Sequence, residues 1–300
     1  MVVGVTARRG NVPLLVAALV SAALTPAALS ACGSPPKETP AVMSVVSAPV
    51  RVAHTRLGAV GYRAVGSGPP LVLIMGYGLT MEGWDPRLVH ALAAHHEVVM
   101  FDNSGIGKTR QLPVPVSIDD MADQTSALIS ALGLAHPEVL GWSMGGTIAQ
   151  ALAVLHPAQV GRLVLCATFP GNGNALSSPA GDQGQRGDWP ANEGGSYSAY
   201  QAAVAQYPAA AKPPALATGQ QATALTDWDV GGDPAGRDTG RIFAPTLIAD
   251  GAEDQLDPVA NNHTLASLIR GSRLKLYPDA GHAFLFQDWA SFASLVNSFL

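Results

Sequence analysis

The clearest chemical signal in this chain is the pentapeptide Gly-Trp-Ser-Met-Gly at positions 141–145. It stands between an apolar run at 138–140 and a helix-like run at 147–155. This context predicts a sharp strand-to-helix turn that holds the hydroxyl of Ser143 outward at the top of a sheet. The glycines leave room around a serine whose backbone the turn forces into a crowded conformation. Such a serine can attack a carbonyl carbon once a base has removed its proton.

A serine nucleophile needs a base, and the base needs a carboxylate to orient it. Of the eight histidines, only His282 follows the last apolar run, on a loop of small residues. The acid we prefer is Asp254, just past the apolar run at 246–249. The rival Asp257 lies three residues further along the same loop and precedes a proline. The chain order Ser143, Asp254, His282 is the order expected of a catalytic triad built on this kind of turn.

Attack on a carbonyl also creates an oxyanion, which backbone N–H groups can stabilise. One donor is expected to be the N–H of Met144, directly after the nucleophile. The second is expected from the loop after Met75-Gly76, at the N–H of Tyr77. The sequence thus predicts an oxyanion hole made of Met144 and Tyr77.

The elements that must position these residues alternate along the chain. Continuous apolar runs, typical of strands buried on both faces of a parallel sheet, stand at 71–75, 97–101, 137–141, 162–167, 245–249 and 273–277. Helical patterns alternate with them at 84–94, 118–132, 147–155, 259–269 and 289–299. A short antiparallel pair is expected before them, within 51–66. The alternation predicts an α/β fold with a doubly wound, mostly parallel sheet.

One segment breaks this rhythm and suggests a division into a core and a cap. We expect the α/β core at 51–170 and 241–300, and a cap or lid insertion at 171–240, which is rich in Gly, Pro, Ala and Gln. The insertion would lie over the carboxyl ends of the strands, where open α/β sheets bind ligands. Its aromatic residues could line an apolar pocket or form a small core of their own; they are Trp189, Tyr197, Tyr200, Tyr207 and Trp228.

The N-terminus is typical of a targeting segment. Two arginines precede an apolar stretch at 12–29, and small residues then lead to Cys32. This pattern predicts a lipoprotein signal peptide at 1–31, lipidation of Cys32, and a flexible tether at 32–50. An ordinary signal peptide and an uncleaved anchor remain as alternatives. The prediction is an exported protein, lipid-anchored to the cell membrane and facing the extracytoplasmic side.

Charge and cysteine content indicate which partners and which covalent bonds to expect. The net charge is −5 and no basic stripe occurs, so a nucleic-acid partner is not expected. With Cys32 joined to lipid, only Cys166 remains, so no intramolecular disulfide is expected. Cys166 lies in an apolar run and is expected to be an inert core thiol.

These motifs together resemble those of the α/β-hydrolase superfamily over residues 55–300. The acid loop Gly-x-x-Asp-x-x-x-Pro at 251–258 and the Gly-His of the base loop match as they stand. The loop at 101–107 resembles the family's Asp-x-Arg-Gly-x-Gly pattern, with Ser104 where arginine is usual, and Met75 stands where the family commonly has histidine. Within the superfamily, the chain looks closest to small bacterial serine esterases, near the aclacinomycin-methylesterase-like and non-haem haloperoxidase-like proteins.

The resemblance and the triad imply an enzyme that hydrolyses a small, apolar carboxylic ester through an acyl-enzyme, with no cofactor and no metal. A cofactor-free perhydrolase of the haloperoxidase type is one alternative, in which peroxide replaces water. Hydrolysis of an amide, thioester or lactone is another. A non-catalytic, ligand-binding lipoprotein is the alternative from a different class.

Overall fold

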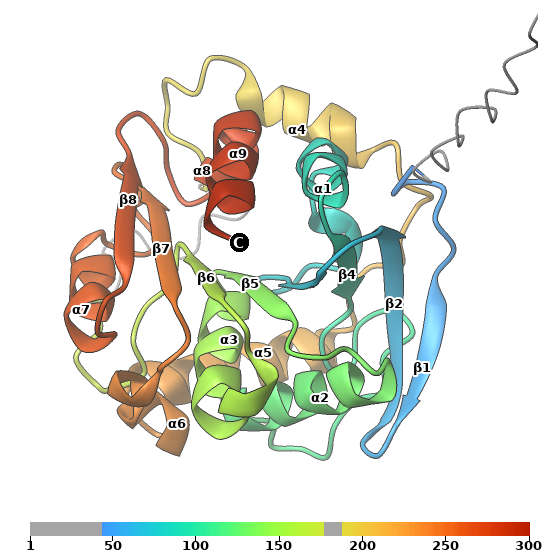
Figure 1. Ribbon diagram of the computed structural model, residues 1–300, viewed down its shortest axis with the longest axis horizontal. Helices are drawn as coiled ribbons and strands as arrows, with labels where there is room; N and C mark the ends of the chain where they lie inside the picture. The colour runs from blue at the N-terminus through green and yellow to red at the C-terminus, as the bar shows by residue number, and fades with distance from the viewer. Residues whose placement is uncertain (1–43, 177–187) are drawn as a thin grey trace, which may run out of the picture. The chain divides into compact units, whose positions relative to one another are not determined.

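A single eight-stranded sheet organises the residues that this computed structural model describes, 44–176 and 188–300 (Figure 1). All of them belong to one compact unit, Ala41–Leu300. The strands are β1 (Arg51–Thr55), β2 (Gly58–Gly66), β3 (Pro70–Ile74), β4 (Glu97–Phe101), β5 (Glu138–Trp142), β6 (Leu163–Cys166), β7 (Thr246–Gly251) and β8 (Arg273–Tyr277).

The strand order in the sheet is β1-β2-β4-β3-β5-β6-β7-β8. Strands β1 and β2 are antiparallel to their neighbours, and every pair from β4 to β8 is parallel. Strand β3 lies between β4 and β5, so the chain reverses its direction of winding at the centre of the sheet. The predicted doubly wound, mostly parallel sheet is confirmed. Its reversal point brings the carboxyl ends of β3 and β5 together, which is where such sheets bind ligands.

Helices cover both faces of the sheet (Figure 1). Apolar side chains of α1, α8 and α9 pack in a cluster on one face, and those of α2, α3 and α7 pack on the other. The helices are α1 (Pro86–Ala93), α2 (Ile118–Ala131), α3 (Met144–Leu155), α4 (Ser196–Val204), α5 (Ala215–Asp229), α6 (Pro234–Arg237), α7 (Ala260–Leu268), α8 (Phe284–Gln287) and α9 (Trp289–Phe299). The predicted helices at 118–132 and 289–299 agree with α2 and α9 to within one residue.

Helix α3 begins at Met144, one turn earlier than the helix-like run at 147–155 indicated. The reason is close packing at its first turn. A Cβ atom on Gly145 would lie 2.0 Å from the carbonyl oxygen of Ile74, and one on Gly146 would lie 2.6 Å from Cβ of Thr168. The two glycines therefore allow the helix to approach the sheet. Because glycine is normally unfavourable inside a helix, the sequence pattern did not predict that the helix includes these positions.

The described part of the segment predicted as a cap contributes three α-helices, which pack at different places. Helix α4 contacts α1 and α8, α5 contacts α2, and α6 contacts α3. Among the aromatic residues, Tyr200 donates a hydrogen bond to the Gly83 carbonyl (2.9 Å) and Tyr207 donates one to that of Trp84 (3.2 Å). Trp189, Tyr200 and Tyr207 share one main apolar cluster, and Trp228 belongs to the other. They therefore pack into the core of the whole unit rather than into a small core of their own.

Several predictions from the N-terminal sequence lie outside the described residues. These are the signal peptide at 1–31, the lipidation site Cys32 and the tether as far as residue 43. Part of the predicted cap, 177–187, lies outside them too. Among the described residues, no helix has the length and apolar character that a membrane crossing requires.

Candidate active site

Ser143 stands in a strained turn between β5 and α3. Its φ and ψ are 57° and −122°, a backbone conformation that residues other than glycine rarely adopt. Its N–H donates to the carbonyl of Cys166 on β6 (2.9 Å), and the helix starts with the next residue. A Cβ atom on Gly141 would lie 2.1 Å from the carbonyl oxygen of Gly145, so the turn closes only with glycine there. The turn therefore holds a partly exposed serine at the carboxyl end of the sheet.

The predicted acid and base lie together on the loops that follow β7 and β8. Nδ1 of His282 is 2.7 Å from Oδ2 of Asp254, and both residues are buried, with 6% and 7% exposed. The other oxygen, Oδ1, accepts the N–H groups of Leu256 (2.8 Å) and Asp257 (2.9 Å), which fixes the orientation of the carboxylate. The rival Asp257 instead accepts from Asn261. Of the two acids, Asp254 is the one that bonds to the imidazole.

The base loop is fixed to the residue that precedes the serine. The indole N–H of Trp142 donates to the carbonyl oxygen of His282 (3.0 Å), and the two rings lie 5.6 Å apart. Within the described residues, the Ser143 hydroxyl forms no hydrogen bond to the imidazole. Catalytic hydrogen bonds are often long without substrate and tighten in the Michaelis complex. Because Nδ1 of His282 faces Asp254, Nε2 is the nitrogen left for the serine.

The loop that follows β3 lies next to the nucleophile. A Cβ atom on Gly76 would be 3.3 Å from Cβ of Ser143. Tyr77, the predicted second oxyanion donor, is in this loop and is 39% exposed. Met144, the predicted first donor, is the first residue of α3, so its N–H has no acceptor within the helix. The N–H of Met144 is therefore available directly after Ser143, and the N–H of Tyr77 stays a predicted donor one residue after Gly76.

Two side chains that the sequence did not single out hold this loop. Nδ2 of Asn103 donates to the Met75 carbonyl (2.9 Å), and the N–H of Gly78 donates to Oε1 of Gln221 on α5 (2.9 Å). These two hydrogen bonds hold the loop in a chain that has Met75 where the family commonly has histidine. Asn103 lies in the loop at 101–107 that carried the family resemblance, so the sequence did contain a signal that could have indicated this residue. Gln221 is 143 positions from its partner, in a segment without a clear pattern, and nothing in the sequence indicated it.

The buried charges around His282 alter its proton affinity. Burial lowers the pKa of the imidazole, but the hydrogen-bonded Asp254 carboxylate, together with Asp188 and Asp257, raises it by more, so the pKa is raised to about 9. The thiol of Cys166 is fully buried, and burial raises its pKa well above the usual range. Cys166 is therefore the inert core thiol that its apolar surroundings predicted.

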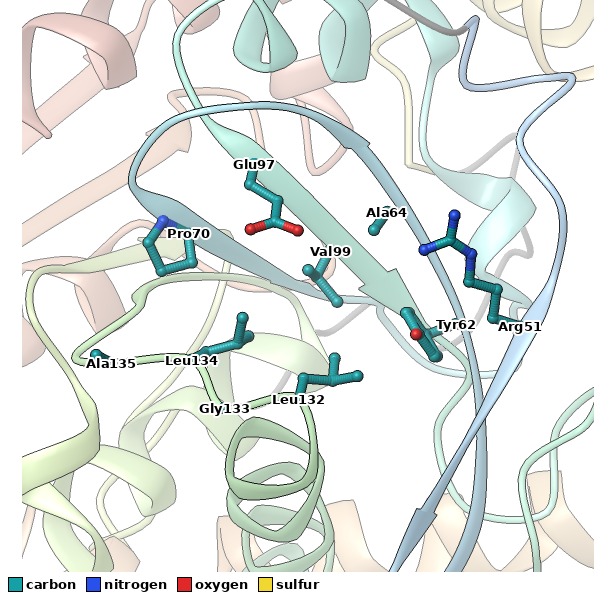
Figure 2. A pocket seen from close by; sticks show the side chains of 10 residues that line it. All are labelled: Arg51, Tyr62, Ala64, Pro70, Glu97, Val99, Leu132, Gly133, Leu134 and Ala135. Carbon is teal, nitrogen blue, oxygen red and sulfur yellow. The ribbon is translucent and has the colours of Figure 1, made fainter.

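A cavity of about 400 Å³ lies elsewhere, against strands β2 and β4 (Figure 2). It is lined by Arg51, Tyr62, Ala64, Pro70, Glu97, Val99 and 132–135. Pro70 and Glu97 are the first residues of the parallel strands β3 and β4, whereas Ser143 follows the last residue of β5. Ser143, Asp254 and His282 are not among its lining residues, so the cavity is not part of the candidate active site.

Comparison with known proteins places this geometry in a family. The model of the alpha/beta hydrolase fold family matches residues 69–199. A Mycobacterium tuberculosis protein whose name assigns it to the non-heme bromoperoxidases, BpoC, is 30% identical over 236 residues, which cover 74% of this chain and 90% of that protein. This chain belongs to the α/β-hydrolase superfamily. Like the members it resembles, this α/β-hydrolase is an enzyme.

Other relatives support the same assignment. A pimeloyl-[acyl-carrier protein] methyl ester esterase from Pseudoalteromonas atlantica is 35% identical over 118 residues, or 39% of this chain and 43% of that protein. In structure, an alpha/beta hydrolase fold protein from Chitinophaga pinensis superposes with a TM-score of 0.74 at 22% identity, covering 85% of this α/β-hydrolase and 98% of that chain. The latter similarity concerns the fold alone.

Proposed function

We propose that this α/β-hydrolase cleaves carboxylic esters, with Ser143 as nucleophile, His282 as base and Asp254 as the carboxylate that orients the base. The observation that carries the proposal is the buried hydrogen bond of 2.7 Å between His282 and Asp254, beside a serine in a strained turn. A base so oriented presents its second nitrogen to the nucleophile, as the triad chemistry requires.

In the first half of the reaction, Oγ of Ser143 attacks the ester carbonyl carbon while its proton passes to Nε2 of His282. The carbonyl oxygen becomes negative and accepts hydrogen bonds from the N–H groups of Met144 and Tyr77. The bond to the alcohol then breaks, and the imidazolium returns the proton to the leaving oxygen. Asp254 stabilises the imidazolium during this step without itself being protonated.

In the second half, water attacks the acyl-enzyme. His282 takes a proton from the water, the oxyanion hole again holds the negative oxygen, and Ser143 leaves with the proton that His282 gives back. The carboxylic acid is released, and the free serine is regenerated. Every step uses side chains or backbone groups of this chain, so the proposal needs no cofactor.

A perhydrolase reaction on the same residues is the second candidate, and the similarity to the bromoperoxidase-named relative favours it. Peroxide would replace water in the second half and give a peroxyacid, which oxidises bromide. Bromination that depends on an added carboxylic acid would distinguish this reaction from simple ester hydrolysis. The relative named as a methyl ester esterase supports the hydrolytic reaction.

We also propose that the protein is exported and held at the membrane by lipid on Cys32. The support is the sequence pattern before Cys32, a positive segment followed by an apolar stretch and small residues. An apolar ester near a membrane is the substrate class that this location suggests. A Cys32→Ser variant that stays in the membrane fraction would contradict the anchor.

Labelling with a fluorophosphonate tests the activated serine directly. The described part of the chain from residue 44 onward, which excludes the proposed signal, is expected to be labelled at Ser143, because a serine paired with an oriented base attacks phosphorus. Labelling should disappear in Ser143→Ala and persist in Ser298→Ala, whose serine lies exposed on α9. A folded wild-type protein that takes no label would favour the non-catalytic binding protein instead.

The pH dependence of turnover tests the base. Since the pKa of His282 is raised to about 9, the imidazole is mostly protonated at neutral pH and cannot accept the serine proton. We expect kcat/KM for a p-nitrophenyl ester to rise about tenfold per unit from about pH 6 and to level off near pH 9. A profile that is flat between about pH 5 and 8 would contradict His282 as the base.

A further inference from the structure

Three carboxyl groups crowd the end of β7 and the loop after it, where the proposed reaction needs only one. Asp250, Asp254 and Asp257 are 0%, 7% and 3% exposed. Among the groups with the largest effects on these carboxyls, His282 is the single potential cation. In the described part of the chain, no three such side chains have the arrangement of metal ligands. Three buried negative charges against one positive charge would be costly, so protons must neutralise part of the cluster.

Hydrogen bonds decide which carboxyl carries the negative charge. Asp254 accepts two backbone N–H groups at Oδ1 and faces the imidazole at Oδ2. A carboxylate with three donors is strongly favoured in its ionised form. Asp254 is therefore the charged member.

Asp250, the next-to-last residue of β7, has a different set of contacts. Its Oδ1 accepts the N–H of Gly251 (2.7 Å), and its Oδ2 accepts from Nδ2 of Asn262 on α7. Its side chain also faces that of Asp254. Two carboxyl groups share a hydrogen bond only if one of them carries a proton. Since Asp254 already faces three donors, the proton belongs to Asp250.

We propose that Asp250 is a positioning residue: it stays a neutral acid, donates a hydrogen bond to Asp254, and so fixes that carboxylate against His282. This inference rests on the proposed triad and adds a residue that acts through it. Burial and the neighbouring Asp254 charge raise the pKa of Asp250 well above the usual range, which agrees with the neutral form. Asn262 anchors the acid from the far side.

Asp257 makes a useful comparison, because it is equally buried but does not share this bond. Its Oδ1 accepts from Nδ2 of Asn261 (2.6 Å), and its Oδ2 has no hydrogen-bond partner among the described residues. Burial and the Asp254 charge raise the pKa of Asp257 to about 7. Above that pH it is ionised, and its charge acts on His282 through space. The other titratable groups that influence the cluster are Cys166 of β6, Asp229 of α5 and Asp188 before α4.

We expect different results when each of the two aspartates is replaced by asparagine. Asp250→Asn keeps a neutral donor, so the pH midpoint of kcat/KM should stay within about 0.3 units of wild type. Asp257→Asn removes a negative charge near the imidazole, so the midpoint should fall by about one unit. Asp250→Leu removes the donor to Asp254, so that carboxylate interacts more strongly with the imidazolium; the midpoint should rise, and kcat/KM at pH 7 should fall about tenfold.

The measurement is kcat/KM for a p-nitrophenyl ester across the pH range, together with the NMR titration of the His282 ring in each folded variant. A midpoint that falls in Asp250→Asn, as in Asp257→Asn, would show that Asp250 is ionised and overturn the inference. A wild-type midpoint in Asp250→Leu, with only a lower Tm, would make Asp250 purely structural and also overturn it. If the wild-type protein shows no turnover, the proposed function fails, but the NMR titration still decides the protonation of Asp250.

Discussion

Replacement of Ser143 or His282 with alanine is expected to lower kcat for ester hydrolysis by about 10⁴- to 10⁶-fold, and the double variant should lose no more than either single one. The reason is that the two residues act as one unit. Without the base, the hydroxyl remains a weak nucleophile, and without the hydroxyl, the base has nothing to activate. Residual turnover would come from substrate binding and the backbone donors of the oxyanion hole.

Matched controls make this result specific. Ser298 lies exposed on α9 and His263 lies exposed on α7. Their alanine variants should keep wild-type kcat and Tm. Steady-state kinetics on one ester, with Tm measured for each variant, would separate a chemical loss from unfolding. Near-normal turnover in folded Ser143→Ala or His282→Ala would disprove the assignment.

Gly145→Ala is expected to cause a large loss of stability. The new Cβ would lie 2.0 Å from the carbonyl oxygen of Ile74 and 2.9 Å from that of Met75. Both contacts are with backbone atoms, so no side chain can rotate away, and β3 or α3 must shift. We expect the free energy of unfolding to fall by about 3 kcal/mol or more. For a unit of this size, that corresponds to a Tm lower by roughly 6–12 °C or more.

Gly219→Ala is the matched control for that substitution. Gly219 lies in α5, where a Cβ atom would meet nothing within 4 Å. Alanine there should stabilise the helix by up to about 1 kcal/mol, because it is the better helix former. Thermal melts of the two variants would thus shift in opposite directions. A Gly145→Ala protein as stable as wild type would show that the close approach of α3 to β3 is wrong.

Local patterns in the sequence predicted the sheet, the order of its helices and the residues of the candidate site. Apolar runs and helical periodicity are short-range signals, because burial on the two faces of a parallel strand depends on the strand itself. The pentapeptide around Ser143 is equally local, since the turn needs its glycines within a few positions. The order of Ser143, Asp254 and His282 along the chain then followed from the loops at the ends of the strands.

The contacts that position those residues are long-range, and only the tertiary structure decided them. Trp142 donates to a carbonyl 140 positions away, and Gln221 reaches Gly78 across 143 positions. The sequence did not single out Asp250, because its contacts with Asp254 and Asn262 depend on how α7 folds back against β7. Single polar side chains of this kind carry no periodic signal. Their partners exist only after the sheet has brought distant loops to one edge.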